Sequence, residues 1–71
     1  MGEYKQSLTC DQWGSWSKEV KKWLIDQDWS KEDLGRAIGY STSTCISALN
    51  QYDRCSKFFI AAVNDLMRRK R

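Results

Sequence analysis

The sequence predicts a small all-α fold, a bundle of four to five helices, and three observations lead to this prediction. The 71-residue chain contains no proline, the residue that most strongly disrupts helix interiors. Apolar residues recur at helical spacing, for example at Trp16, Val20, Trp23 and Leu24. Serines stand directly before several such segments, where their hydroxyls favour helix N-termini. A chain of this length supports one small core and therefore one domain.

Composition divides the chain into three parts. Residues 1–15 are mostly polar, and with Gly2 and Gly14 as breaks we expect an N-terminal arm. The helical domain covers residues 16–67. Residues 68–71 form a basic C-terminal tail, and without these four cations the other 67 residues hold 8 basic and 9 acidic groups. The excess positive charge belongs to the tail, so the overall charge gives little support for nucleic-acid binding.

The first two helices are expected on either side of an acidic break. Ser17 is the expected N-cap of the first helix, which ends near Asp26 because acidic residues oppose the negative end of the helix dipole. Ser30 is the expected N-cap of the second helix, with Asp33 in a capping-box position. Gly39 ends that helix in a left-handed conformation. The expected inner face of the second helix is Leu34, Ala37 and Ile38.

Two further helices complete the domain. Ser41 is the expected N-cap of a third helix over residues 42–49, and residues 50–55 form a connecting loop. Ser56 is the expected N-cap of the fourth helix. The expected inner face of the third helix is Cys45, Ala48 and Leu49, and that of the fourth is Phe59, Ala62, Val63, Leu66 and Met67.

The cysteines and the lack of histidine exclude several kinds of chemistry. Cys10, Cys45 and Cys55 form no C-x-x-C pair, so we expect small packing residues and neither a metal nor a cofactor. Three reduced thiols and no apolar leader predict a cytoplasmic location. No apolar run is long enough to span a membrane. Without histidine, a G-x-S-x-G motif or a glycine-rich phosphate loop, we expect no enzyme.

The two short helices around Gly39 predict a helix-turn-helix unit. Such a joint needs a small residue at the helix crossing, which Gly35 provides, and a residue that tolerates positive φ in the turn, which is Gly39. Tyr40 can serve as an apolar plug in the turn. Cys45 is the inward residue of the second helix of the pair.

Residues 29–50 resemble the helix-turn-helix of the Cro/CI-type (XRE-like) regulators of phages and mobile elements. The matching features are Leu34-Gly35, Ile38-Gly39, Tyr40-Ser41 and the closing Asn50. With a helix before and a helix after, the resemblance covers about residues 17–67. It implies a lambda-repressor-like fold and a sequence-specific regulator of transcription, repressor-like, that binds duplex DNA as a homodimer.

The resemblance also implies which residues meet DNA. The second helix of the unit would enter the major groove. Between Thr42 and Ala48 it has none of the Arg, Lys, Asn or Gln side chains that commonly read guanine and adenine. The implied base contacts are Thr42, Ser43, Thr44, Ile46 and Ser47. The implied phosphate contacts are Ser30, Lys31, Asn50, Gln51, Tyr52, Arg54, Arg68 and Arg69.

A second interpretation keeps the helix-turn-helix but changes its partner. The poorly discriminating Ser and Thr face would suit a protein-interaction module, an antirepressor or an inhibitor of a host protein. Trp13 and Trp16, if exposed, would mark the interaction surface. Trp23 and Trp29 are expected in the core. Three lysines of the first helix, Lys18, Lys21 and Lys22, are expected to form a solvated face.

Overall fold

The computed structural model describes residues 8–70 and confirms the predicted all-α fold. Four α-helices and one short 3₁₀ helix follow one another along the described chain. They are α1 (Cys10–Gln27), α2 (Lys31–Ile38), α3 (Thr42–Asn50), η2 (Tyr52–Arg54) and α4 (Lys57–Arg69). None of the helices in the described range is long and apolar enough to cross a membrane.

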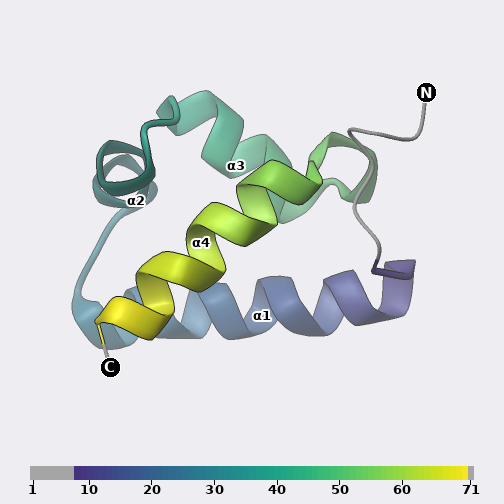
Figure 1. The fold of residues 1–71 in the computed structure, drawn as a ribbon, viewed down its shortest axis with the longest axis horizontal. Helices are drawn as coiled ribbons and strands as arrows, with labels where there is room; N and C mark the ends of the chain where they lie inside the picture. The colour runs from purple at the N-terminus through teal and green to yellow at the C-terminus, as the bar shows by residue number, and fades with distance from the viewer. Residues whose placement is uncertain (1–7, 71) are drawn as a thin grey trace.

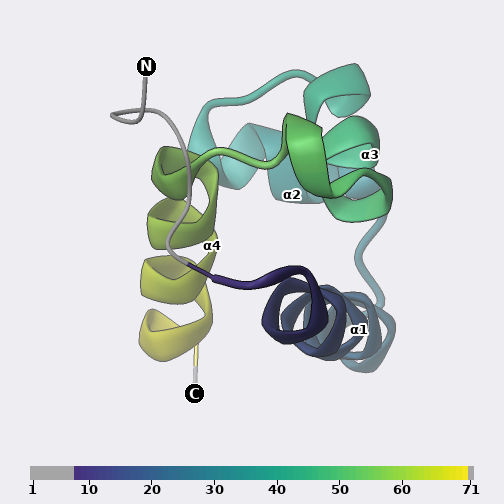
Figure 2. The same cartoon turned by 90° about the vertical axis from the view of Figure 1, so that its right-hand side faces the viewer.

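The helices pack with α1 at one edge and the α2–α3 pair at the other. Figure 1 shows α1 along the bottom, α2 and α3 above it, and α4 crossing diagonally in front. The turned view in Figure 2 keeps α2 and α3 at the top and α1 at the bottom. α4 spans the height between them, because its N-terminal end lies near α3 and its C-terminal end lies at the level of α1.

The core takes residues from every α-helix and from the segment before α4. Its larger side chains are almost completely buried, and each fully buried Leu or Phe contributes about 1.5–3 kcal/mol. The buried hydrophobic residues are Val20, Leu24, Leu34, Cys45, Ala48, Leu49, Cys55, Phe59 and Val63. This set confirms the predicted inner face of α3 and, on α4, Phe59 and Val63 of the predicted face. Leu66 and Met67 of that face are partly buried against the core.

The four tryptophans pack around this core and are half-buried. Trp23 and Trp29 meet edge to face with ring centroids 5.6 Å apart, which closes the joint between α1 and α2. Trp16 packs edge to face on Phe59 at 6.2 Å, and its indole N–H donates to Asn64 Oδ1 at 2.8 Å. The aromatic contacts therefore tie α1 to α2 and to α4.

α1 begins earlier than the sequence predicts. Its N-cap is Thr9, whose Oγ1 accepts from the Gln12 N–H at 3.2 Å, while Gln12 Oε1 accepts from the Thr9 N–H at 2.9 Å. Ser17 lies buried inside the helix, and its hydroxyl donates to the Gly14 carbonyl at 3.4 Å. The prediction of an N-cap at Ser17 was therefore wrong.

The early start also changes the expected N-terminal arm. Residues 10–15 are helical, and Gly14 lies in the helix interior and does not break it. The capping box at Thr9 satisfies backbone N–H groups at the start of α1. This stabilisation offsets the cost of a glycine in a helix interior, about 1 kcal/mol. Residues 1–7 of the predicted arm lie outside the described residues.

Ala37 does not face the core as predicted. Leu34 and Gly35 are buried, Ile38 is half-buried and Ala37 is exposed. α2 has only eight residues, and it approaches α3 through Gly35. Because α2 contacts α3 at Gly35, its inner face is centred on Leu34 and Gly35, and Ala37 points away from the core. The prediction of Ala37 on the inner face was therefore wrong.

The remaining caps agree with their predictions. Ser30 and Asp33 form a capping box at α2, and Ser41 accepts from the Thr44 N–H at 3.1 Å. Ser56 accepts from the Phe59 N–H at 3.1 Å at the start of α4. The expected loop over residues 50–55 is partly ordered into η2, and Asn50 is the last residue of α3.

Candidate nucleic-acid interface

The joint between α2 and α3 consists of Gly39, Tyr40 and Ser41. Gly39 has φ of 81°, the left-handed conformation that the sequence predicts. The Gly39 and Tyr40 N–H groups both donate to the Gly35 carbonyl at 2.8 Å. A Cβ at Gly35 would overlap the Tyr40 carbonyl oxygen and touch Cys45 Sγ. The two glycines therefore set how closely α3 follows α2.

One side of α3 is completely buried, and this orients the other side toward solvent. Cys45, Ala48 and Leu49 have no exposed surface. The structure brings the five predicted base contacts together on the rest of this helix. Thr42, Ser43, Thr44 and Ile46 are exposed, and Ser47 is half-buried.

The start of α3 carries only small hydroxyl side chains. Ser41 Oγ accepts the Thr44 N–H and lies 2.8 Å from Thr44 Oγ1 in a second hydrogen bond. The first turn of α3 contains no acidic residue. The positive end of this helix dipole is therefore not neutralised by a carboxylate of its own turn.

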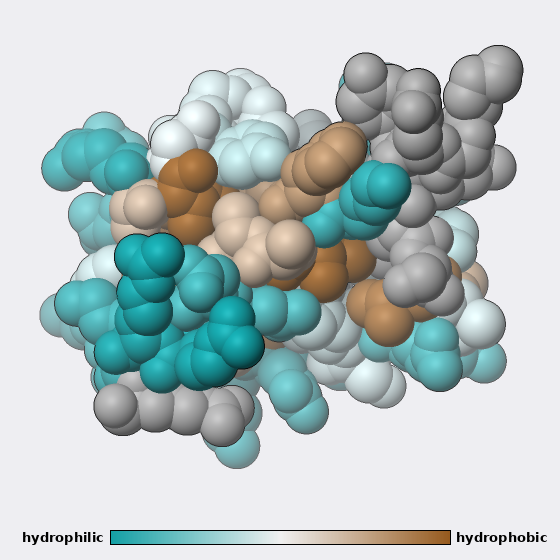
Figure 3. Space-filling view, viewed as in Figure 1, coloured by the Kyte–Doolittle hydropathy of each residue, from teal (hydrophilic) through white to brown (hydrophobic). Residues whose placement is uncertain are grey.

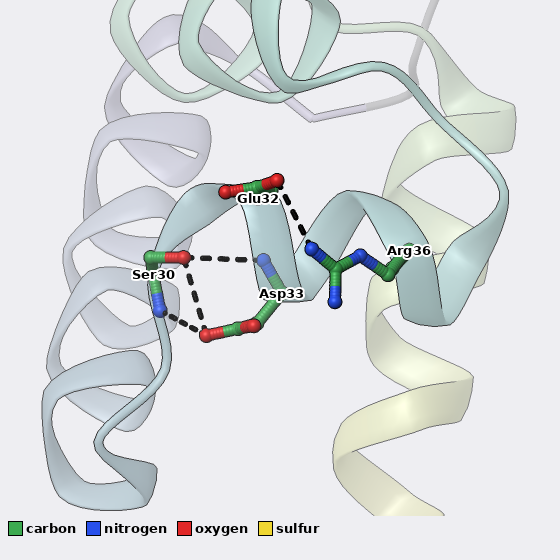
Figure 4. A network of polar contacts seen from close by, with 4 residues as sticks. All are labelled: Ser30, Glu32, Asp33 and Arg36. Carbon is green, nitrogen blue, oxygen red and sulfur yellow. Dashed lines mark hydrogen bonds and ion pairs between the residues drawn. The ribbon is translucent and has the colours of Figure 1, made fainter.

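The start of α2 differs, because its own carboxylate caps it (Figure 4). Asp33 Oδ2 accepts from the Ser30 N–H at 2.9 Å and from the Ser30 hydroxyl at 3.2 Å. The hydrogen bond from the Ser30 backbone N–H lowers the pKa of Asp33 most, and the hydrogen bond from the Ser30 hydroxyl lowers it further. Glu32 is paired with Arg36 at 3.0 Å. Asp33 thus takes the hydrogen bonds that the predicted phosphate contact at Ser30 would need, while Lys31 beside it is half-buried.

The predicted phosphate contacts after α3 divide into two kinds. Asn50 Oδ1 accepts from Lys21 Nζ at 3.1 Å, and the Tyr52 hydroxyl donates to the Leu8 carbonyl at 2.7 Å. These two side chains hold the end of α3 and η2 against α1 and the segment before it. Gln51 and Arg54 are exposed, and within residues 8–70 their side chains form no hydrogen bond or ion pair.

The basic C-terminal end lies away from α3. Arg68 and Arg69 both pair with Asp65, at 3.2 and 2.6 Å. Lys70 Nζ lies 5.2 Å from the centre of the Trp29 ring. Figures 1 and 2 place this end of α4 at the level of α1, and Figure 3 shows its surface as hydrophilic. The structure therefore does not bring Arg68 and Arg69 together with the predicted contacts on α3.

Charges balance across the segment that carries the candidate interface. Between Ser30 and Arg54 the cations are Lys31, Arg36 and Arg54, and the carboxylates are Glu32, Asp33 and Asp53. Arg36 is already paired with Glu32. The unpaired cations available to this interface are consequently few.

Sequence reasoning missed Lys21 as a neighbour of the candidate interface. It was predicted to lie on a solvated face of α1, yet it is half-buried and bonded to Asn50, 29 residues away. No local signal marks such a pairing, because it depends on how α1 packs against α3. The other lysines of the predicted solvated face, Lys18 and Lys22, are exposed.

The cysteines are free thiols, and two of them are buried. Burial raises the pKa of Cys45 and Cys55, and a hydrogen bond from Trp13 partly opposes the shift at Cys55. Cys10 is exposed. Over residues 8–70 no group of three His, Cys, Asp or Glu side chains is placed to hold a metal ion.

No family model matches the chain, and no curated protein and no solved structure gives a significant match.

Proposed function

We propose that this protein is a sequence-specific, repressor-like regulator of transcription that binds duplex DNA through a helix-turn-helix formed by α2 and α3. One observation carries the proposal most strongly. α3 is anchored by completely buried residues on one side, while Thr42, Ser43 and Ile46 project from the other. A short helix held in this way behind a tight turn is the element that enters a major groove in such units.

In this proposal, different parts of the α2–α3 helix pair contact different parts of the DNA. The hydroxyls of Thr42, Ser43 and Ser47 hydrogen-bond to base edges. The start of α3, which has no acidic residue in its first turn, favours a phosphate. Arg54 and Gln51 reach the backbone on the other side of the groove. Since Arg36 is paired with Glu32, Lys31 is the other cation of residues 30–54 that is available to phosphate.

A homodimer on a two-fold site goes with this proposal. One module of this size contacts few base pairs, and two modules about 34 Å apart along the duplex multiply the affinity. The resemblance to Cro/CI-type regulators supports an origin in a phage or mobile element. A cytoplasmic location also belongs to the proposal, and the three free thiols favour it.

The test introduces the same negative charge, a serine-to-glutamate substitution, at one position on α3 and at one position on α1. The protein is equilibrated with a pool of random duplexes at low salt, and bound duplexes are recovered and measured by fluorescence anisotropy. Ser43→Glu should weaken binding on the order of ten-fold, because a carboxylate would face phosphates and base acceptors. Glutamate also suits the first turn of a helix, so α3 should remain folded.

Ser15→Glu is the matched control, since Ser15 is exposed on α1 at the opposite edge of the molecule. It makes the same substitution and should leave the affinity unchanged. Equal affinities of the two variants, or no duplex bound by the unmodified protein at about 50 mM salt, would refute the proposal.

The alternative, a helix-turn-helix module that binds a host or phage protein, is favoured by the balanced charge of residues 30–54 and by the exposed Ile46. The alternative also expects an exposed surface at Trp13 and Trp16, but both side chains are half-buried. Trp13 packs on Tyr52 and Trp16 on Phe59. Failure of the duplex-binding test with a folded protein would turn the search to a protein partner of α3.

A further inference from the structure

The side chain of Ile46 gives α3 an apolar group in the middle of a hydroxyl-rich surface. In the described part of the chain, three large hydrophobic residues are exposed: Ile25 at 77%, Phe58 at 50% and Ile46 at 43%. Of these, Ile46 is the one on α3. Its neighbours along the chain, Cys45 on one side and Ser47 on the other, are buried and half-buried.

We infer that α3 reads the 5-methyl groups of thymine, so that its target is a duplex site built around T·A pairs. This inference rests on the proposed function and names the base that the same surface selects. Thymine presents an O4 acceptor and a methyl group in the major groove, and apolar side chains contact that methyl. Ile46 is the side chain of α3 with an exposed aliphatic surface large enough for this contact.

Thr42 extends the methyl-bearing surface. Thr42 lies one helical turn before Ile46, so the two side chains are neighbours on the helix. Both residues are exposed.

The hydroxyls beside Ile46 fit the same base pair. Ser43 and Ser47 are three residues before and one residue after it, and a serine hydroxyl can both donate and accept. It can therefore donate to thymine O4 or adenine N7 and accept from adenine N6. Guanine is read by the long cationic side chains of Arg and Lys, and residues 42–49 contain neither.

The experiment removes the methyl group without changing base pairing. A duplex is first selected by the full-length protein from a random pool and then synthesised with deoxyuridine in place of thymine. Affinities for both duplexes are measured for the unmodified protein, for Ile46→Ala and for Ile25→Ala. Ile46→Ala should stay folded, because the side chain is exposed and alanine is the better helix former.

The unmodified protein should lose about four-fold in affinity for each contacted methyl that uracil removes, the value for one buried methyl-sized group. Ile46→Ala should bind the thymine duplex more weakly and lose its preference for thymine over uracil. Ile25→Ala, the same change on α1, should keep both the affinity and the preference.

Four results would overturn the inference. Equal affinity of the unmodified protein for the thymine and uracil duplexes, or selected sites built on G·C pairs, would refute methyl reading while leaving duplex binding intact. An unchanged thymine preference in Ile46→Ala would refute the role of this residue. Recovery of no duplex at all by a folded protein would overturn the proposed function together with this inference.

Discussion

Asp33 shows how one side chain decides what the N-terminus of α2 can bind. It accepts hydrogen bonds from the backbone N–H and the hydroxyl of Ser30, the groups that would otherwise face an anion. These bonds lower its pKa, so the carboxylate stays charged in the folded protein at pH values where it is protonated in the unfolded chain. α2 therefore has an internal anion, and α3 has none in its first turn.

This cap predicts a specific dependence of stability on pH. A carboxyl group with a lowered folded-state pKa stabilises the fold above its unfolded pKa of about 3.9 and loses this contribution as pH falls through the folded value. Asp33→Asn should therefore lower the free energy of unfolding at neutral pH. The difference from the unmodified protein should shrink as pH falls below about 4. Urea denaturation at a series of pH values between about 7 and 3 measures it.

Ser30→Ala separates the two causes of the shift. Alanine removes the hydroxyl but keeps the backbone N–H, which is the larger cause. In that background, the Asp33→Asn substitution should still produce most of its pH-dependent effect, while the cap itself weakens by about 1 kcal/mol. Identical acid-unfolding profiles for the unmodified protein and Asp33→Asn would contradict the assignment.

Three glycines of the described residues have different surroundings. Gly14 lies inside α1 with open space where a Cβ would stand. Gly35 meets the Tyr40 backbone at the α2–α3 crossing, and Gly39 has a left-handed φ of 81°. Packing therefore requires glycine at position 35, and the backbone conformation requires it at position 39. Neither requires it at position 14.

Alanine at each position should give a different sign or size of effect. Gly14→Ala should stabilise the protein by about 0.5–1 kcal/mol, the cost of glycine in a helix interior. Gly39→Ala should cost about 1–2 kcal/mol for the left-handed conformation. Gly35→Ala should cost about 3 kcal/mol or prevent folding, because the clashing atom is backbone and cannot rotate away.

Urea denaturation midpoints of the three variants check the order. Gly14→Ala serves as the internal control, since it adds the same methyl group to a helix of the same chain. A loss of stability in Gly14→Ala as large as that in Gly35→Ala would show that the α2–α3 crossing is not the close contact described above.

Over the whole domain, the positive charge and the candidate interface occupy different places. Arg68, Arg69 and Lys70 lie at the end of α4, next to Asp65 and Trp29. α3 lies at the opposite edge, within a segment of balanced charge. The excess of cations that characterises the composition therefore does not mark the surface proposed to bind DNA.

This separation predicts a shallow salt dependence of duplex binding. The logarithm of the affinity falls with the logarithm of salt concentration by about 0.9 for each phosphate contact on duplex DNA. With Lys31 and Arg54 as the cations of the interface, the slope should be about −2 per chain. Arg54→Gln should reduce its magnitude by about one. The measurement is an anisotropy titration between about 50 and 300 mM salt.

The control is the double variant Arg68→Gln and Arg69→Gln, which removes two cations from the other end of the molecule. Its slope should equal that of the unmodified protein. A flatter slope in this variant, with no change in Arg54→Gln, would show that the C-terminal end and not the α3 surface holds the phosphates.

Local signals were sufficient to predict most helix boundaries. Ser30, Ser41 and Ser56 cap helices, and Gly39 ends one, because each of these interactions is completed within about four residues. The buried face of α3 also follows from the spacing of Cys45, Ala48 and Leu49 alone. Such features depend on short-range hydrogen bonding and periodicity, which a sequence displays directly.

The position of α1 required contacts between distant segments. Thr9 and Gln12 can form their capping box unaided, yet the first turns of α1 are also held by Trp13 against Tyr52, with ring centroids 5.9 Å apart. The Tyr52 hydroxyl bonds the Leu8 carbonyl in the same region, 44 residues away along the chain. Because these partners are so distant in sequence, the polar composition of residues 1–15 was a misleading guide.

The all-α class, the caps of α2, α3 and α4 and the exposed Ser and Thr face of α3 were already determined by the order of residues, because helices form through local periodicity and local hydrogen bonds. Tertiary packing decided which charges accompany that face. It joined Lys21 to Asn50 and placed Arg68 and Arg69 at the opposite edge. Distances between side chains on different helices depend on how the helices cross, and packing of the shared core sets those crossings.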